Sequence, residues 1–192
     1  MTKNPITTGI ILFIITMLIF FAVYYFFGNI NYFDISLKVN SFVLPVIYGG
    51  TALYSVRSFW KSRTSVTFRD AFNKAFVPMF VGGFLSVSGI FLFLNFGDVE
   101  AKNLLNHQFV EKNKAELTSV YQKEKSRLKN EAQLADLEKD YQKSMQSFSM
   151  EQVKEKDMFT ASHFSGYFAA ILVFYLIISL FLGAFFRSKT EI

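Results

Sequence analysis

The residues that could do catalytic or metal chemistry are few, and their spacing matches no catalytic or metal-binding pattern. His107 and His163 could bind zinc with a carboxylate, but neither belongs to a His-x-x-x-His or Glu-x-x-His pair. Ser55, Ser86 and Ser88 have no partnered base that would activate a nucleophile. The chain has no cysteine, which excludes disulfides and thiolate chemistry. We therefore expect no catalytic residue, no cofactor and no metal site, and interpret the chain as not an enzyme.

One glycine pattern occurs twice, at residues 45–50 and 78–83: a proline, three bulky residues and two glycines. No Lys-Ser or Lys-Thr follows either copy, so neither resembles a phosphate-binding Walker loop. Each proline frees a backbone carbonyl four residues back, at Ser41 and Lys74, and glycines let a neighbouring helix approach closely. An inverted repeat like those of transporters is the alternative interpretation. The favoured one is helix packing at Pro45, Gly49, Gly50, Pro78, Gly82, Gly83 and Gly166.

Four basic residues gather between the two glycine patterns: Arg57, Lys61, Arg63 and Arg69. Trp60 lies among them, as expected of an indole at the headgroup level of a membrane. The cluster is interpreted first as a topology signal. It could also hold anionic lipid headgroups, at about 1 kcal/mol per basic residue near the surface.

The net charge of +5 does not indicate a nucleic-acid-binding protein, because the charge is partitioned. Residues 98–159 carry 11 basic and 12 acidic side chains, while the rest of the chain carries 9 basic and 3 acidic ones. The basic surplus lies beside apolar segments, where membrane orientation explains it better than phosphate contacts do.

These residues must be positioned by four apolar blocks, each about as long as a membrane span. The blocks cover roughly residues 6–27, 39–56, 68–96 and 164–186. The first is too long for the apolar part of a signal peptide and has no small-residue cleavage site, so it is expected to stay as a span. None has Asp, Glu, Lys or Arg at mid-depth, which argues against a pump or a proton-coupled transporter. The predicted fold is an all-α membrane protein with a four-helix bundle.

The orientation follows from the Lys and Arg residues of the short loops. Lys3, the loop 57–69 and the tail with Arg187 and Lys189 are basic, whereas the first loop has only Asp34 and, at its edge, Lys38. Basic loops stay in the cytoplasm. Both termini are therefore predicted to be cytoplasmic and the insert between spans three and four extracytoplasmic. The organisation is then 1–97 with three spans, 98–160 with the insert, and 161–192 with span four and the tail.

The insert is expected to be helical, because residues 99–164 contain neither Gly nor Pro. Its apolar stripe changes phase between Asn130 and Ala135, so a bent hairpin and an extended helix both remain open. Two capping boxes predict helix starts. Thr67 to Asp70 would begin the third span, and Ser149 to Gln152 a short helix before the fourth.

The segment Thr67-Phe68-Arg69-Asp70-Ala71-Phe72, before a glycine-containing third span, resembles a bacterial family of small four-span inner-membrane proteins classed as a domain of unknown function. Members have Ser/Thr-Phe-x-x-Ala-Phe there and a long charged helical insert before the last span. The segment 147–152 is similar to a Phe-x-Met-Ser/Thr-Glu-Glu-like stretch of that insert. The resemblance implies a bacterial inner (cytoplasmic) membrane protein and no particular activity.

The expected function is therefore that of a non-enzymatic accessory or scaffold protein of the cell envelope. Its partners would be the lipid bilayer and an envelope protein bound through residues 98–160, with no nucleic acid. A small homo-oligomeric transporter or channel, with the Pro and Gly positions as gates, is the alternative.

Overall fold

The computed structural model describes residues 4–128, 130–148 and 157–188, which are helical and contain no strand. The all-α prediction is confirmed for these residues. The helices are α1 (Pro5–Phe27), α2 (Tyr32–Lys38), α3 (Leu44–Lys61), α4 (Phe68–Leu92), α5 (Val99–Lys125), α6 (Glu131–Gln146) and α8 (Ala161–Phe186), with the π-helical segments η1 (Val39–Val43) and η2 (Phe93–Gly97).

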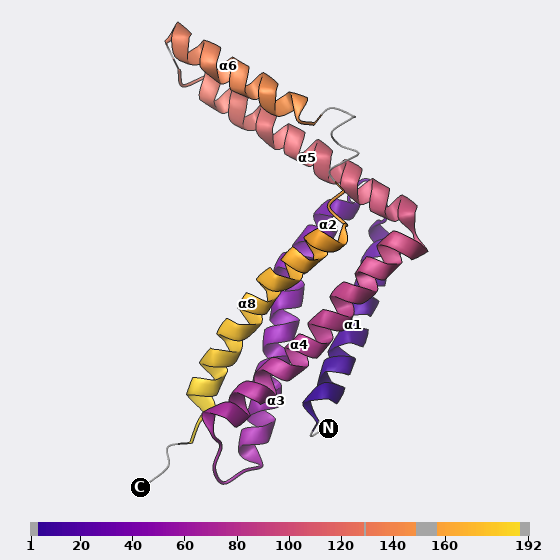
Figure 1. Ribbon diagram of the computed structural model, residues 1–192, viewed down its shortest axis with the longest axis vertical. Coiled ribbons are helices and arrows are strands. Elements are labelled where there is room, and N and C mark those ends of the chain that lie inside the picture. Colours follow the sequence, from indigo (N-terminus) through magenta and orange to yellow (C-terminus); the bar gives the residue numbers. More distant parts are fainter. Residues whose placement is uncertain (1–3, 129, 149–156, 189–192) are drawn as a thin grey trace.

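Among the described residues, four helical stretches are long and apolar enough to cross a membrane, as predicted. They are Pro5–Phe27, Tyr32–Lys61, Phe68–Gly97 and Ala161–Phe186. The start of α1, the α3–α4 connection and the end of α8 lie together at one end, here called the basic end (Figure 1). The hairpin of α5 and α6 extends from the opposite end, here called the insert end (Figure 1).

Helix α4 is the centre of the packing, and it contacts α1, α3 and α8. Most of its buried residues are small, among them Ala71, Ala75, Gly82 and Gly83, although Met79 is buried as well. At the small residues the neighbouring backbones can approach closely, which is the usual basis of association inside a membrane. The small-residue side of α4 therefore accounts for the arrangement of the four stretches.

The second candidate span is longer than its apolar block. It begins at Tyr32 rather than at residue 39, because α2, η1 and α3 follow one another without a break. Tyr32 is 1% exposed and packs with Val23, Leu94 and Leu105, and this packing outweighs the polar composition of the segment. At the other end α3 continues to Lys61, so the connection to α4 spans only residues 62–67.

A serine compensates for the proline inside α4. Pro78 has no amide hydrogen for the Lys74 carbonyl one turn earlier. Ser55 of α3 donates a hydrogen bond of 2.8 Å to that carbonyl. Ser and Thr side chains commonly satisfy backbone groups freed by proline in membrane helices. Ser55 therefore has a structural role.

The start of α4 is the predicted capping box. The Asp70 amide donates to Thr67 Oγ1 at 3.2 Å, and the Thr67 amide donates to Asp70 Oδ2 at 3.4 Å. This prediction is confirmed. The capping box predicted for residues 149–152 lies outside the residues that the structure describes.

The insert contains a helical hairpin rather than one extended helix: α5 ends at Lys125, and α6 returns alongside it (Figure 1). Tyr121 and Tyr141 stack across the hairpin, with ring centroids 4.2 Å apart. The Tyr121 hydroxyl donates a hydrogen bond to Glu138, and Lys125 donates one of 2.9 Å to the same hydroxyl. The bend lies between Lys125 and Glu131, just before the change in stripe phase at Asn130 to Ala135.

Candidate functional site

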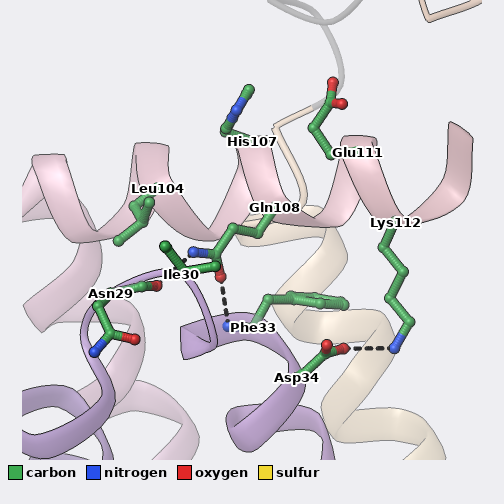
Figure 2. A pocket seen from close by; sticks show the side chains of 9 residues that line it. All are labelled: Asn29, Ile30, Phe33, Asp34, Leu104, His107, Gln108, Glu111 and Lys112. Atoms are coloured by element: carbon green, nitrogen blue, oxygen red, sulfur yellow. Dashed lines mark hydrogen bonds and ion pairs between the residues drawn. The ribbon is translucent and has the colours of Figure 1, made fainter. Parts of the chain in front are cut away.

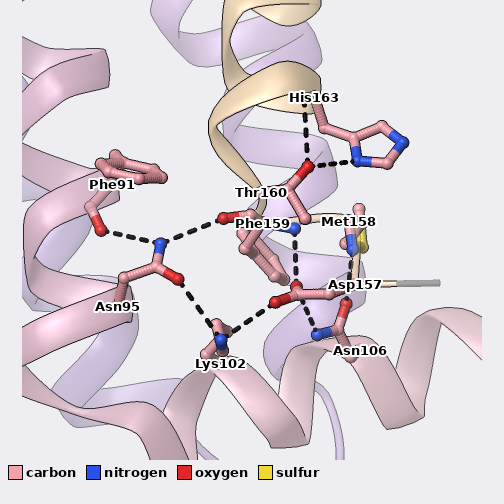
Figure 3. Close-up of polar contacts among 9 residues, drawn as sticks. All are labelled: Phe91, Asn95, Lys102, Asn106, Asp157, Met158, Phe159, Thr160 and His163. Atoms are coloured by element: carbon pink, nitrogen blue, oxygen red, sulfur yellow. Dashed lines mark hydrogen bonds and ion pairs between the residues drawn. The ribbon is translucent and has the colours of Figure 1, made fainter. Parts of the chain in front are cut away.

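A polar cluster joins α5 to the insert end of the bundle (Figure 3). Lys102 of α5 forms a 3.0 Å ion pair with Asp157 and donates a 3.3 Å hydrogen bond to Asn95 of η2. Asn106, one turn further along α5, donates to Asp157 Oδ1 at 2.9 Å. Asn95 Nδ2 in turn donates to the Phe159 carbonyl at 3.0 Å. We call Asn95, Lys102, Asn106 and Asp157 the polar clamp.

Asp157 stays ionised because the polar clamp surrounds it with donors. Its partial burial tends to raise the pKa, but hydrogen bonds from Asn106, the Phe159 amide and Lys102 outweigh that effect. The net result is a pKa below the ordinary value of an aspartate. The Lys102–Asp157 pair is mostly shielded, with side chains 16% and 27% exposed, so it orients α5 more firmly than a surface ion pair would.

Asp98 supports the same junction from the first turn of α5. It accepts a 2.9 Å hydrogen bond from the Ala101 amide as the N-cap of the helix. The Tyr24 hydroxyl at the end of α1 donates to its other oxygen at 2.5 Å. The bond from Tyr24, with the smaller contribution of the Ala101 amide, lowers the pKa of Asp98. Because Asp98 is the N-cap, this contact ties the direction of α5 to α1.

An open pocket of about 670 Å³ lies between the α1–α2 turn and α5 (Figure 2). We call it the insert groove. It is lined by Asn29, Ile30, Phe33, Asp34, Leu104, His107, Gln108, Glu111 and Lys112.

The walls of the insert groove are held by two side chains of α5. Gln108 accepts a hydrogen bond of 2.7 Å from the Phe33 amide and donates one of 2.5 Å to the Asn29 carbonyl. Lys112 pairs with Asp34 at 2.7 Å, which raises the pKa of Lys112. Ile30 is 90% exposed in the turn beside the groove. The groove thus combines a fixed frame with an apolar side chain open to a partner.

A second polar cluster lies inside the bundle. The Thr16 hydroxyl of α1 donates to the Leu12 carbonyl at 2.8 Å and lies 3.1 Å from the Tyr48 hydroxyl of α3. The Tyr48 hydroxyl is also 3.3 Å from Ser86 Oγ of α4. The Tyr48 ring stacks on that of Tyr175 of α8 at a centroid distance of 5.3 Å. All four candidate spans thus meet at Tyr48.

The predicted basic cluster is distributed over helix ends rather than along one loop. Arg57 and Lys61 belong to the last two turns of α3, and Arg69 to the first turn of α4. Arg63 lies over the ring of Phe59, 5.5 Å from its centroid.

The predicted packing positions divide into two groups. A Cβ at Gly82 would come within 3.0 Å of the Gly9 carbonyl oxygen, and one at Gly83 within 2.6 Å of the Tyr175 hydroxyl. At Gly49, Gly50 and Gly166 an added Cβ would meet nothing within 4 Å, so these three do not mediate close approach within the chain. Pro78 is buried in α4, while Pro45 lies at the start of α3 directly after η1.

The two histidines are separate in the structure. His107 lines the insert groove, while His163 Nδ1 lies 2.8 Å from the Thr160 hydroxyl at the start of α8. Within residues 4–128, 130–148 and 157–188, no three His, Cys, Asp or Glu side chains are grouped as metal ligands.

The sequence analysis missed the polar clamp and the role of Gln108. Asn95 binds the backbone of Phe159. Its signal was an amide inside the apolar run Phe91-Leu92-Phe93-Leu94-Asn95-Phe96. Nothing in the sequence indicated that Asp157 is its neighbour, because 62 residues separate the two positions.

The fold and these contacts define a class: a helical protein with four potential membrane spans and a polar hairpin fixed to one end. A model of the DUF4199 family, described as a protein of unknown function, matches residues 7–188. The chain therefore belongs to this family, in agreement with the resemblance to a domain of unknown function. No curated protein and no solved structure matches the chain.

Proposed function

We propose that this protein is a non-enzymatic accessory or scaffold protein of the bacterial inner membrane, which presents the α5–α6 hairpin to an envelope partner. The main observation behind the proposal is that contacts with other segments hold α5 in a fixed position. Contacts from α1, α2, η2 and the segment before α8 hold its first half. Binding is stronger when the contact residues are already ordered, because less conformational entropy is lost. The contacts that hold α5 provide this order.

The insert groove is the proposed contact site. Ile30 and the apolar walls Phe33 and Leu104 would take an apolar side chain of the partner. The rim carries Glu111 and Lys112, which would select a partner with complementary polar groups. An apolar centre with a charged rim is the usual composition of such a contact.

The proposed orientation places the basic end in the cytoplasm and the insert groove outside the membrane. Arg57, Lys61, Arg63 and Arg69 lie at or between the end of α3 and the start of α4, and Arg187 follows α8, so these residues belong to the basic end. Positive residues in short segments remain on the cytoplasmic side, which supports this orientation. The partner would then be an extracytoplasmic protein or domain.

Photocrosslinking in living cells tests the scaffold function. A photoreactive residue in place of His107, which lines the insert groove, is expected to yield a discrete crosslinked protein. Ile30→Asp should abolish that product, because a charge replaces the exposed apolar contact while the fold is left intact. The same photoreactive residue in place of Ser62, at the basic end, is the matched control and should not give that product. The proposal is rejected if the photoreactive residue at position 107 gives no crosslinked protein. It is also rejected if Ile30→Asp leaves the crosslinked product unchanged.

The cluster around Tyr48 favours a second candidate, a small homo-oligomeric transporter or channel. Hydroxyl groups of three helices meet inside the bundle there, and polar groups inside a membrane often line a pathway. Flux through proteoliposomes that falls in Tyr48→Phe or Gly82→Leu would support this function. Absence of flux for ions and small solutes would reject it.

A further inference from the structure

A second pocket, of about 580 Å³, lies at the basic end between the last turns of α3 and α8. Its volume falls in the range of about 300–1,000 Å³ that is usual for small-ligand sites. We call it the arginine pocket. It is lined by Leu53, Arg57, Trp60, Phe185, Phe186, Arg187 and Ser188.

Toward the basic end, the lining of the arginine pocket passes from the apolar Leu53 to the polar and headgroup-type residues Arg57, Trp60 and Arg187. Leu53, Arg57 and Trp60 follow one another at spacings of four and three on one side of α3, which runs toward that end (Figure 1). Helix α8 runs in the same direction and brings Phe185 in its last turn, followed by Arg187 beyond its end. A phospholipid in the adjacent leaflet has the same order, with acyl chains inward and a headgroup outward.

Ring packing and hydrogen bonds also hold the walls of the pocket in place. The Trp60 and Phe186 rings pack edge to face, with centroids 6.1 Å apart. The Ser188 amide donates to the Val66 carbonyl at 2.9 Å, and the Val66 amide donates back to Ser188 Oγ at 3.1 Å. This pair holds the chain after α8 against the α3–α4 connection, and therefore holds Arg187 beside the end of α3.

Within residues 4–128, 130–148 and 157–188, the two cations of the arginine pocket have no acidic partner. Each ion pair among the described residues involves a lysine of α5, and none includes Arg57 or Arg187. Leu53, Trp60 and Phe185 are 44%, 45% and 72% exposed, so the pocket is open on the apolar side of the bundle. Guanidinium groups bind phosphate oxygens through two parallel hydrogen bonds.

We propose that the arginine pocket binds an anionic phospholipid. Arg57 and Arg187 hold its phosphate, Trp60 lies at the level of the headgroup, and Leu53 and Phe185 contact the glycerol backbone and the start of an acyl chain. The lipid bridges the ends of α3 and α8. The site does not depend on the scaffold function, and the groove at the opposite end plays no part in it.

Trp60 provides the measurement, because it is the only tryptophan in the chain. Full-length protein is reconstituted in phosphatidylcholine vesicles that contain an equal fraction of brominated phosphatidylglycerol or brominated phosphatidylcholine. Bromine quenches tryptophan fluorescence at short range, so the difference between the two lipids reports preferential binding. We expect stronger quenching by the anionic lipid, and recovery of fluorescence when unbrominated phosphatidylglycerol competes. Equal quenching by the two lipids would overturn the proposal.

Variants assign the preference to the pocket. Arg57→Gln and Arg187→Gln are each expected to reduce the preference for the anionic lipid about fivefold, the effect of one basic residue near an anionic surface. Arg69→Gln removes an equal charge from the same end outside the pocket and should change the preference clearly less than either pocket variant. Helical content by circular dichroism verifies folding. A preference that survives in both pocket variants, or that falls equally in Arg69→Gln, would overturn the proposal.

Soluble glycerol phosphate distinguishes a lipid from a free phosphate ligand. It should leave the quenching by brominated phosphatidylglycerol unchanged, since it lacks the acyl chain that the apolar wall contacts. Displacement of the lipid by glycerol phosphate would instead identify a site for soluble phosphates and overturn the lipid assignment.

Discussion

At the scale of the residue, Ser55 and Gly9 show how α4 is accommodated at the centre of the bundle. Ser55 donates to the Lys74 carbonyl that Pro78 leaves without its helical partner. Gly9 gives α1 close access to α4, since a Cβ there would lie 2.7 Å from Val81 Cβ. One residue supplies a hydrogen bond and the other supplies space, and each has a direct test.

Ser55→Ala should destabilise the protein by about 0.6 kcal/mol, and at most ~1.7, which is the measured range for hydrogen bonds inside membrane proteins. When Pro78 is also replaced by alanine, Ser55→Ala should destabilise the protein less, because the new amide of residue 78 can donate to the Lys74 carbonyl. Unfolding in mixed detergent micelles, followed by circular dichroism, gives both values. An equal cost in the two backgrounds would contradict this account of the proline.

Gly9→Ala should destabilise the protein by about 1–3 kcal/mol, the usual cost of forcing extra atoms into a packed contact. The added methyl would also lie 3.0 Å from the Pro78 carbonyl oxygen, which α4 cannot easily move. Gly50→Ala is the control, because a Cβ at this position meets nothing within 4 Å. It should be neutral or stabilising by up to ~1 kcal/mol through helix propensity. In the same unfolding measurement, the Gly9→Ala protein should therefore be clearly less stable than the Gly50→Ala protein.

At the scale of the element, the direction of α5 is determined by side chains at its first turns. Asp98 caps the helix and binds Tyr24, while Lys102 and Asn106 bind Asp157. Further along, Gln108 and Lys112 bind α2 and the turn before it. Because these contacts lie at successive turns of α5, the helix cannot pivot about its first residue relative to the rest of the structure.

The stability that Asp157 contributes should depend on pH. Its folded pKa lies below the ordinary value of 3.8, so the contribution is fully present above the unfolded pKa and is lost as the pH falls through the folded one. Asp157→Asn should therefore lower the midpoint of thermal unfolding at about pH 7, and the difference from the wild type should narrow toward about pH 3.

Glu111→Gln is the control for Asp157→Asn. Glu111 also has a lowered pKa through Lys114, but it is exposed, and its ion pair among the described residues lies within α5 itself. Its substitution should leave the midpoint nearly unchanged at both pH values. A pH-independent effect of Asp157→Asn would show that the polar clamp does not act through the carboxylate charge.

At the scale of the whole molecule, two chemically different ends are separated by the length of four apolar helices. The α3–α4 connection lies at the basic end, and the turn between α5 and α6 lies beyond the insert end (Figure 1). Ser62 and Ser126 belong to these two turns. If the four helices span the membrane, the two serines face opposite sides.

Single cysteines test this orientation in a chain that has none of its own. Ser126→Cys should react with a membrane-impermeant maleimide in intact spheroplasts, and Ser62→Cys should react only after the membrane is opened. Both substitutions are at exposed turns and should leave the fold unaffected. The reverse pattern would place the basic end outside and reject the predicted topology, and equal labelling of both would reject the four spans.

The sequence predicted the elements well where a local pattern was sufficient. The apolar blocks predicted four long helices, and Thr67 with Asp70 predicted where α4 begins. The prediction was less accurate for the second span, since Tyr32 is buried by residues of η2 and α5 that are far away in the chain. The sequence also did not separate Gly82, where an added Cβ would meet α1, from Gly50, where an added Cβ would meet nothing within 4 Å.

The candidate sites depend on the tertiary structure. Asn95, Lys102 and Asp157 come from three separate segments, and only the return of the chain before α8 brings them together. Arg57 was visible in the sequence as one charge among several, but its neighbour Arg187 lies 130 positions away.

The sequence by itself thus determined the class of the protein, because burial of apolar helices and helix capping depend on residues within a few turns of one another. Only the tertiary structure decided what those helices bring together: the polar clamp, the insert groove and the arginine pocket. Each combines side chains from distant segments, and hydrogen bonds and ion pairs act only over a few ångströms, so their partners are determined by the fold rather than by spacing in the chain.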